Sequence, residues 1–396
     1  MMDSAFSLKN LKTAHVYQKL KSILFLIFPV LVVLGNFELW LGASSLTLPW
    51  LLLIILPFVL LDMAMLWKSR CNSEWLPFMF LYGLLFVLGG LSALADSDTS
   101  LSRNLASLLP LTVALAVLYC FRDVSLSFSV TRIMCVAGAC LVFMIFMKSI
   151  LLYWPAINSG QVHEVFGYKS EMGLPLGKSN FLAVFLAFFA VFAWRANKVL
   201  YVAILLAACL TLSRFGVAFV LFAGLCACLL SYVRLSVIAL VIVGFSILTV
   251  LPVFFFPTQA VALARECSLP ESLIARFELW RAALELLAGR FFWGAGPGGF
   301  TTYLEFVGWP RYEWGTHNFV LAQWVEYGFL GLTVYFIILV RFFLLHAEQD
   351  SADYELVKLA GAILLFYALF ENVVGLVAFE VMFAYLICLL SARRTA

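Results

Sequence analysis

The chain has 396 residues, of which 64% are hydrophobic and only 12% are charged, and its formal net charge is +3. Soluble globular chains are about half apolar and about one quarter charged, so this composition excludes a soluble protein. The small net charge gives no reason to expect nucleic acid as a partner. Apolar stretches long enough to cross the roughly 30 Å hydrocarbon core of a bilayer recur along the chain. The sequence therefore predicts an all-α polytopic membrane protein.

Twelve transmembrane helices are predicted within one integral membrane domain, 1–396, and an even number places both termini on the same side. The lysines and arginines of the short loops favour the cytoplasm for that side, following the positive-inside rule. The predicted spans are 22–41, 46–67, 75–95, 105–121, 133–154, 179–195, 199–212, 214–232, 235–256, 317–345, 356–373 and 375–392.

Two loops on the opposite, outer side of the membrane are long enough to be functional, 155–178 and 257–316. The second contains "SLPESLIARFELWRAALELLAG", which predicts an amphipathic helix that starts at a Ser268–Glu271 capping box and stops near Gly289. At 100° per residue, one apolar stripe forms. It consists of Leu273, Phe277, Trp280, Ala283, Leu284 and Leu287. The loop also holds five arginines, namely Arg265, Arg276, Arg281, Arg290 and Arg311.

Arg281 can pair within this helix, because Glu278 and Glu285 lie three and four residues away. Arg276 differs, since it falls inside the apolar stripe and has no acid at either spacing. Its guanidinium either extends along the apolar surface to the headgroup level or binds an anion supplied from elsewhere. The second alternative is favoured.

Arg214 follows an unusually short apolar stretch. About 14 apolar residues separate Lys198 from Ser213, which as a helix would span about 21 Å, less than the bilayer core. The spacing predicts that Ser213 and Arg214 occupy a tight turn slightly below the outer surface. An arginine at that depth faces the protein interior or a wet cavity and has a partner; the alternative is an ordinary loop arginine between longer helices.

The segment "WGAGPGGF", residues 293–300, matches the pattern G-x-G-x-x-G. A dinucleotide site requires a preceding strand and a following acid, whereas here a helix precedes the glycines and Pro297 interrupts them. The pattern instead predicts a re-entrant or interfacial turn whose backbone approaches the membrane or a lipid headgroup.

His317 stands at the start of the long apolar run "HNFVLAQWVEYG". Thr316 is a suitable N-cap, which would place His317 and Asn318 in the first helical turn. The positive end of a helix favours the neutral imidazole and binds anions with its exposed N–H groups. The sequence thus predicts a base beside an anion site, although a structural role for this histidine stays open. His163, in the other long loop, is a weaker candidate.

A lipid that carries phosphate or pyrophosphate fits such a site, because its tail lies in the bilayer and its head at the surface. Arginines would hold the phosphates through charge-assisted bonds, and the histidine would deprotonate an attacking hydroxyl. The sequence supplies no cluster with metal-ligand spacing, so neither a cofactor nor a metal is expected.

These motifs resemble those of the bacterial O-antigen ligase and polymerase superfamily. The resemblance lies in "LTLSRFG" (211–217), "RFELWRAALELLAGRFFWGAGPGGF" (276–300) and "HNFVLAQWVEYGFLGL" (317–332), and in a large loop ahead of the last helices. It implies a metal-independent, inverting glycosyltransferase of the GT-C type in the bacterial inner membrane. The donor would be a glycan on undecaprenyl pyrophosphate, with His317 acting on the acceptor hydroxyl and Arg214 and Arg276 binding the pyrophosphate. Asn318, Arg311, Glu326 and His163 are further candidates for supporting roles.

Two activities within this family compete. A ligase transfers the glycan to lipid A-core in lipopolysaccharide biosynthesis, whereas a polymerase transfers it to another lipid-linked repeat. Polymerases are often described with an R-x10-G motif, but here twelve residues separate Arg276 from Gly289 and Arg281 from Gly294. The sequence therefore favours the ligase.

A transporter or flippase of lipid-linked sugars is the alternative from another class. Transporters tend to show internal repeats and ionisable residues near the bilayer centre. Here only Asp62, Glu371 and Glu380 are candidates for central charges, and Glu326 precedes Gly328 in the His317 helix, where it can orient that segment. Because the charges concentrate at one face, an interfacial enzyme is favoured.

Overall fold

The computed structural model describes residues 2–34, 38–39, 48–65, 75–95, 101–122, 124–126, 129–160, 165, 172, 174, 176, 179–230, 232–235, 237, 255–309, 315–345, 352–371 and 376–394. Helices account for most of these residues, together with four strands of two residues each. The helices are α1 (Met2–Leu34), α2 (Trp50–Met65), α3 (Leu76–Ala95), α4 (Leu101–Phe121), α5 (Val130–Asn158), α6 (Ser179–Ala196), α7 (Lys198–Leu210), α8 (Arg214–Leu229), α10 (Pro257–Glu266), α11 (Glu271–Leu287), α12 (Gly299–Phe306), α13 (Phe319–Leu344), α14 (Ala352–Ala368) and α15 (Val377–Ser391).

Eleven of the twelve predicted spans overlap helices, and the remaining one, 235–256, lies mostly outside the described residues. The spans 22–41 and 46–67 also include the short strands Glu38–Leu39 and Leu48–Pro49. Five helices of the described chain are long and apolar enough to cross a membrane, namely α1, α3, α5, α6 and α13. Four shorter apolar stretches, in α4, α7, α8 and α15, accompany them. The fold is therefore that of a polytopic helical membrane protein.

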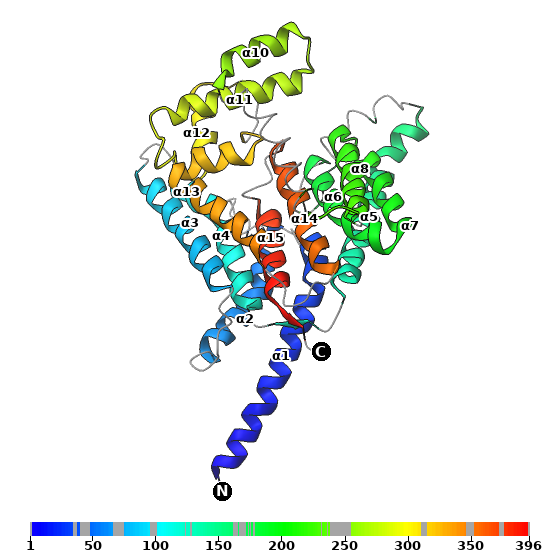
Figure 1. The fold of residues 1–396 in the computed structure, drawn as a ribbon, viewed down its shortest axis with the longest axis vertical. Helices are drawn as coiled ribbons and strands as arrows, with labels where there is room; N and C mark the ends of the chain where they lie inside the picture. Colours follow the sequence, from blue (N-terminus) through cyan, green and yellow to red (C-terminus); the bar gives the residue numbers. More distant parts are fainter. Residues whose placement is uncertain are drawn as a thin grey trace.

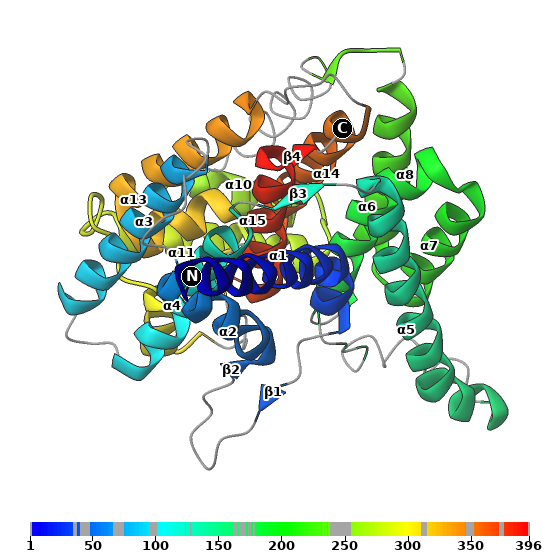
Figure 2. The same cartoon turned by 90° about the horizontal axis from the view of Figure 1, so that it is seen from below.

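The membrane helices form two groups with a central pair between them. Helices α3, α4 and α13 lie on one side, and α5, α6, α7 and α8 lie on the other (Figure 1). The view from below shows α14 and α15 between these groups (Figure 2). Helices α10, α11 and α12 cover one end of the molecule, opposite the end from which the N-terminal part of α1 projects (Figure 1).

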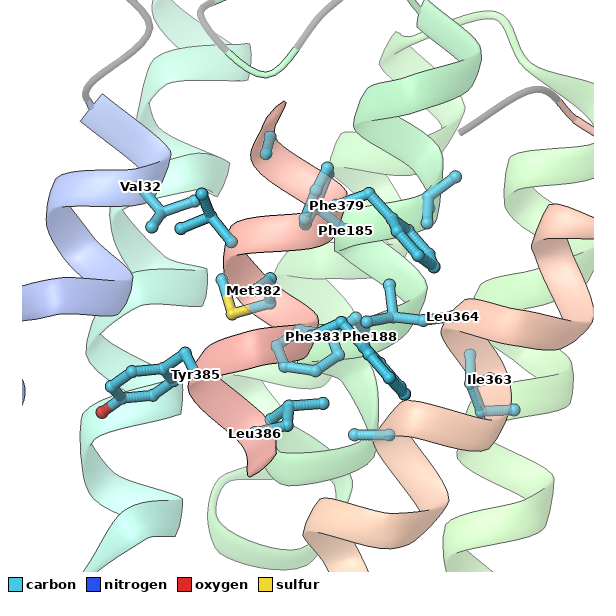
Figure 3. Close-up of a cluster of buried hydrophobic side chains, with 14 of the residues drawn as sticks. Val32, Phe185, Phe188, Ile363, Leu364, Phe379, Met382, Phe383, Tyr385 and Leu386 are labelled. Atoms are coloured by element: carbon cyan, nitrogen blue, oxygen red, sulfur yellow. The ribbon is translucent and has the colours of Figure 1, made fainter. Parts of the chain in front are cut away.

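Helix α15 forms the centre of the hydrophobic core. Every residue from Ala378 to Ser391 is buried, as expected for a helix that is apolar on most of its surface. The buried acid in it, Glu380, accepts a hydrogen bond from the Tyr82 hydroxyl at 3.4 Å. Phe379 and Phe383 lie beside Phe185 and Phe188 of α6, whereas Met382 lies on the side of Val32 of α1 (Figure 3). The last predicted span is thus an internal helix.

A second, smaller core joins α10, α11 and α12 to the first part of α13, and we call this unit, residues 257–325, the cap. Its buried apolar side chains come from α11, α12 and α13. The predicted amphipathic helix is therefore present, but it begins at Glu271 with Pro270 at the N-cap, and no side-chain cap hydrogen bond forms. Ser268 has a φ of 51° and lies outside the helix, so the predicted capping box is wrong.

The glycine-rich segment packs where α13 is interrupted. Gly328 has φ 69° and ψ −175°, a conformation that breaks the helix. The Ala295 N–H donates to the Val325 carbonyl at 2.6 Å, and the Phe329 N–H donates to the Phe291 carbonyl at 2.9 Å. The turn therefore approaches the backbone of α13, and its approach to the membrane or a lipid headgroup stays a prediction.

Candidate functional site

Glu371, in the connection that follows α14, is the centre of a buried charged cluster. Its Oε1 atom lies 2.6 Å from Nδ1 of His317. Its Oε2 atom accepts hydrogen bonds from Nη2 of Arg276 at 3.0 Å and from Nδ2 of Asn180 at 2.9 Å. The three donors come from the segment before α13, from α11 and from α6, so the tertiary fold brings the cap and the membrane core together at one carboxylate.

His317 lies just outside the helix in which it was predicted. Asn318 is the N-cap of α13, and its side-chain oxygen accepts from the N–H groups of Val320 and Leu321 at 3.0 and 3.1 Å. His317 has a φ of 49°, in a left-handed region that is uncommon for residues other than glycine. The Thr316 N-cap prediction is therefore wrong by two residues. The adopted turn directs the ring to Glu371 and away from the helix end.

The segment before His317 is held against the cap. The Nε1–H group of Trp280, in α11, donates to the Thr316 carbonyl at 2.6 Å, and the Thr316 hydroxyl donates to the Asn318 carbonyl at 2.7 Å. Both Thr316 and Asn318 are buried. The backbone on each side of His317 is thus fixed by hydrogen bonds, which stabilises its left-handed conformation.

The anion that binds the Arg276 guanidinium in this structure is a carboxylate of the protein itself. The sequence shows no acid near it in α11, yet Glu371, 95 residues away, supplies a carboxylate. The Arg276 side chain is 12% exposed, and its guanidinium carbon lies 5.3 Å from the ring centroid of Phe215. Within the described residues, Glu371 is its only hydrogen-bond partner, so further N–H groups of the fork remain for a ligand.

Arg214 is the first residue of α8, next to the same cluster. Its N-cap, Ser213, accepts from the Gly216 N–H at 3.1 Å and donates to Oδ1 of Asn180 at 3.1 Å. Phe215, on its other side, contacts Arg276. Helix α7 has 13 residues, as short as predicted. The partner expected for Arg214 is not found among the described residues. Its side chain is exposed and forms no hydrogen bond or ion pair with any of them.

The cluster fixes the charge of Glu371, which lies beyond the end of α14. Burial alone would raise the pKa of this carboxyl group. The hydrogen bond and charge of His317, the charge of Arg276 and the Asn180 hydrogen bond outweigh burial, so the pKa lies below its ordinary value of 4.5. Glu371 is therefore a carboxylate at neutral pH, and it holds a proton on Nδ1 of His317, because a carboxylate only accepts hydrogen bonds.

The other predicted candidates have different positions. The Glu326 carboxyl group accepts a hydrogen bond from the backbone N–H of Gly298, which links it to the glycine-rich turn, and its role in orienting the His317 helix stays a prediction. Asn318 caps α13, and its buried Nδ2 has no hydrogen-bond partner among the described residues. Arg311 and His163 lie outside the described residues. Arg281 pairs with Glu285 at 3.5 Å, as predicted.

Sequence reasoning missed Glu371 and Asn180 as members of the site. Glu371 was considered as a central membrane charge, but α14 ends at Ala368 and places it after the helix. Successive membrane helices are antiparallel, so the start of α13 and the end of α14 must reach the same face. This topology is the signal that could have paired His317 with Glu371; no comparable signal marks Asn180.

The arrangement can move a proton and bind an anion. With Nδ1 directed to Glu371, the other ring nitrogen of His317, Nε2, is the atom that can accept a proton from a hydroxyl. Arg276 shares the Glu371 carboxylate with this ring, and Arg214 begins α8 between Ser213 and Phe215, which contact the cluster. Arginine side chains favour phosphate oxygens. Among the described residues, no group of three or more histidine, cysteine, aspartate or glutamate side chains could hold a metal ion.

The fold and this cluster define a multi-pass membrane protein with a charged site beneath a cap. Residues 199–336, about a third of the chain, match the family model described as O-antigen ligase. This match supports the resemblance to the O-antigen ligase and polymerase superfamily, a family of glycosyltransferase-like membrane enzymes. The matched segment contains Arg214, Arg276 and His317, whereas Asn180 and Glu371 lie outside it. The chain matches no curated protein.

Proposed function

We propose that this protein is an O-antigen ligase, which transfers a glycan from undecaprenyl pyrophosphate to a sugar hydroxyl of lipid A-core. The observation that carries the proposal is the meeting of His317 and Arg276 on one carboxylate, with Arg214 between two residues that contact the same cluster. The match of residues 199–336 to the O-antigen ligase family model supports this class of substrate. Such a site contains the base and the cations that displacement of a lipid pyrophosphate needs.

The proposed reaction is a single displacement. The acceptor oxygen attacks the anomeric carbon and forms the new glycosidic bond, while Nε2 of His317 takes the hydroxyl proton. The bond from the anomeric carbon to the pyrophosphate oxygen breaks on the opposite face, and undecaprenyl pyrophosphate leaves with the electron pair. The configuration at the anomeric carbon is inverted. Glu371 stabilises the imidazolium that forms on His317.

The arginines act on the leaving group in this proposal. Arg214 is exposed and forms no ion pair with a described residue, so it can bind the pyrophosphate without first losing a partner. Arg276 keeps its bond to Glu371 through Nη2 and uses its remaining N–H groups for the same ligand. Their charges neutralise the negative charge that builds up on the leaving oxygen, so the proposed chemistry needs no metal ion.

The proposal also sets the orientation in the membrane. We place the protein in the bacterial inner membrane as a GT-C enzyme with twelve spans and cytoplasmic termini. The cap and the charged cluster face the periplasm. The structure places the N-terminus and the cap at opposite ends of the molecule (Figure 1), which is compatible with this orientation.

The test is reconstitution of the purified protein with a glycan on undecaprenyl pyrophosphate, lipid A-core and EDTA. A core lipid of increased mass, absent with His317→Ala, is the expected result. Elongation of the donor glycan without modification of the core would identify a polymerase. Transfer to neither acceptor, with both substrates verified, would contradict the proposal and favour a transporter of lipid-linked sugars.

A further inference from the structure

Asn180, the second residue of α6, connects the two halves of the charged cluster. Its Nδ2 donates to Oε2 of Glu371 at 2.9 Å, and its Oδ1 accepts from the Ser213 hydroxyl at 3.1 Å. Its backbone carbonyl accepts from the Tyr367 hydroxyl at 3.1 Å. Asn180 therefore lies between the turn that carries Arg214 and the carboxylate that holds His317.

The chemistry of its neighbours allows only one orientation of the Asn180 amide. Glu371 is a carboxylate and can only accept hydrogen bonds, so the NH₂ group must face it. The oxygen then faces Ser213, whose Oγ accepts from the Gly216 N–H and uses its own proton for Asn180. A flipped amide would place its oxygen against the carboxylate and would lose this bond. The direction of the chain from Ser213 through Asn180 to Glu371 is thus fixed.

The same contacts restrict the position of Glu371. Without Asn180, the Glu371 carboxylate would be bound only by His317, whose ring faces the substrate, and by Arg276, which belongs to the cap. Neither donor would fix the carboxylate to the membrane core. Asn180 adds a third donor from the membrane core, on the same Oε2 atom that Arg276 uses. This third donor fixes the carboxylate relative to α6 and α8, which carries Arg214.

We propose that Asn180 is a positioning residue, which fixes Glu371 and so aligns the His317 ring with the donor site at the Ser213–Arg214 turn. This inference rests on the proposed function, because it assumes that His317 is the base. Asn180 itself contacts neither the donor nor the acceptor in this arrangement. Its effect should appear in turnover and in the titration of His317, with donor affinity changed less.

The first experiment measures turnover and donor KM for Asn180→Ala, Ser213→Ala and the double variant. Asn180→Ala should lower turnover about 10- to 100-fold, the range expected for loss of one hydrogen bond to a charged group. The double variant should be slowed by less than the product of the two single effects, because both changes break the Ser213–Asn180–Glu371 chain, whereas only Ser213→Ala also removes the N-cap bond of α8. Asn197→Ala is the control, since this asparagine caps α7 through the Val199 and Leu200 N–H groups and should leave turnover unchanged.

The second experiment does not depend on transfer activity. Carbethoxylation of the His317 peptide by diethyl pyrocarbonate, followed by mass spectrometry, reports the fraction of neutral ring at each pH. Asn180→Asp keeps an acceptor for Ser213 and places a second carboxylate beside Glu371. The charged groups facing that carboxylate are then His317 and Arg276, with the Tyr367 hydroxyl nearby. An added negative charge favours the protonated ring, so the midpoint of modification should move to higher pH than in the wild type.

The outcomes separate this inference from the proposed function. A wild-type turnover for Asn180→Ala, or an unchanged modification midpoint for Asn180→Asp, would overturn the positioning role even if the enzyme transfers glycan. Absence of transfer by the wild-type protein would contradict the proposed function, yet the modification midpoint would still decide whether Asn180 acts on His317. If Asn180→Ala fails to fold, Asn180→Asp and Ser213→Ala carry the test.

Discussion

The Nδ1 atom of His317 and the Oε1 atom of Glu371 lie 2.6 Å apart, although 54 residues separate them in the sequence. Helices α13 and α14 fill most of that interval and run in opposite directions, so they return the chain to the end at which it started (Figure 1). The carboxylate determines which ring nitrogen carries the proton. It also offsets the charge that the ring acquires when Nε2 accepts a second one.

Replacing His317 tests the base assignment directly. His317→Ala should lower turnover by about 10²–10⁴, the usual contribution of a general base, with little change in donor KM. Initial rates of core-lipid modification over a range of donor concentrations measure both quantities. A variant that retains wild-type turnover would exclude His317 as the base.

Glu371→Gln keeps the size of the side chain but loses the charge. An amide can present its NH₂ group to Nδ1 of His317, which would then accept, so that the ring proton moves to Nε2. The ring could then no longer take a proton through Nε2, so turnover should fall by about 10²–10⁴, as in related triads. Steady-state kinetics measure the effect. The companion variant Glu371→Asp retains the charge but shortens the reach, so it should keep more activity than Glu371→Gln. If the two were equally active, the ion pair would have no catalytic role.

Arg276→Lys tests whether two properties of the guanidinium, its fork and its charge, are both needed. A lysine can bind either Glu371 or a phosphate oxygen but cannot bridge them with planar geometry. Donor affinity should weaken by about 1.5–3 kcal/mol, the range for one hydrogen bond to a charged group. The donor concentration dependence of the rate gives this value. Arg265→Lys is the matched control in the cap, because Arg265 pairs with Glu278 at an exposed site.

The depressed pKa of Glu371 predicts a loss of stability in acid. A carboxyl group whose pKa is lower in the folded state contributes stability above its unfolded value, and this contribution disappears as the pH falls through the folded value. The thermal midpoint of the wild-type protein should therefore decrease below about pH 4.5. Glu371→Gln should be less stable at neutral pH and should lose less on acidification. Identical pH profiles for the two proteins would contradict the assigned charge.

Gly328→Ala should disrupt the contact between the glycine-rich turn and α13. A Cβ atom at Gly328 would lie 2.1 Å from the Phe292 carbonyl oxygen, and its φ of 69° disfavours any side chain. The variant should lower the thermal midpoint and the yield of folded protein, as measured by size-exclusion chromatography in detergent. Gly90→Ala in α3 is the control, because a Cβ there meets no atom within 4 Å and alanine favours a helix by about 1 kcal/mol.

The sequence by itself determined the class of the protein and the positions of most helices. Apolar composition and stretch length are local properties, and a bilayer selects for them wherever they occur. Arg214, Arg276 and His317 could be recognised in the same way, since each is a polar residue in an apolar context. Their roles as donor-binding residues and base remain predictions.

Only the tertiary structure decided how these residues are paired. A buried guanidinium requires an anion, but any acid that the fold brings near can supply it, and local spacing cannot select among them. Glu371 therefore emerged as the partner of both Arg276 and His317, and Asn180 as its third donor. The left-handed turn at His317 likewise depends on the Trp280 bond from the cap. Helix periodicity describes which side of a helix is apolar, whereas the site depends on which helices are neighbours.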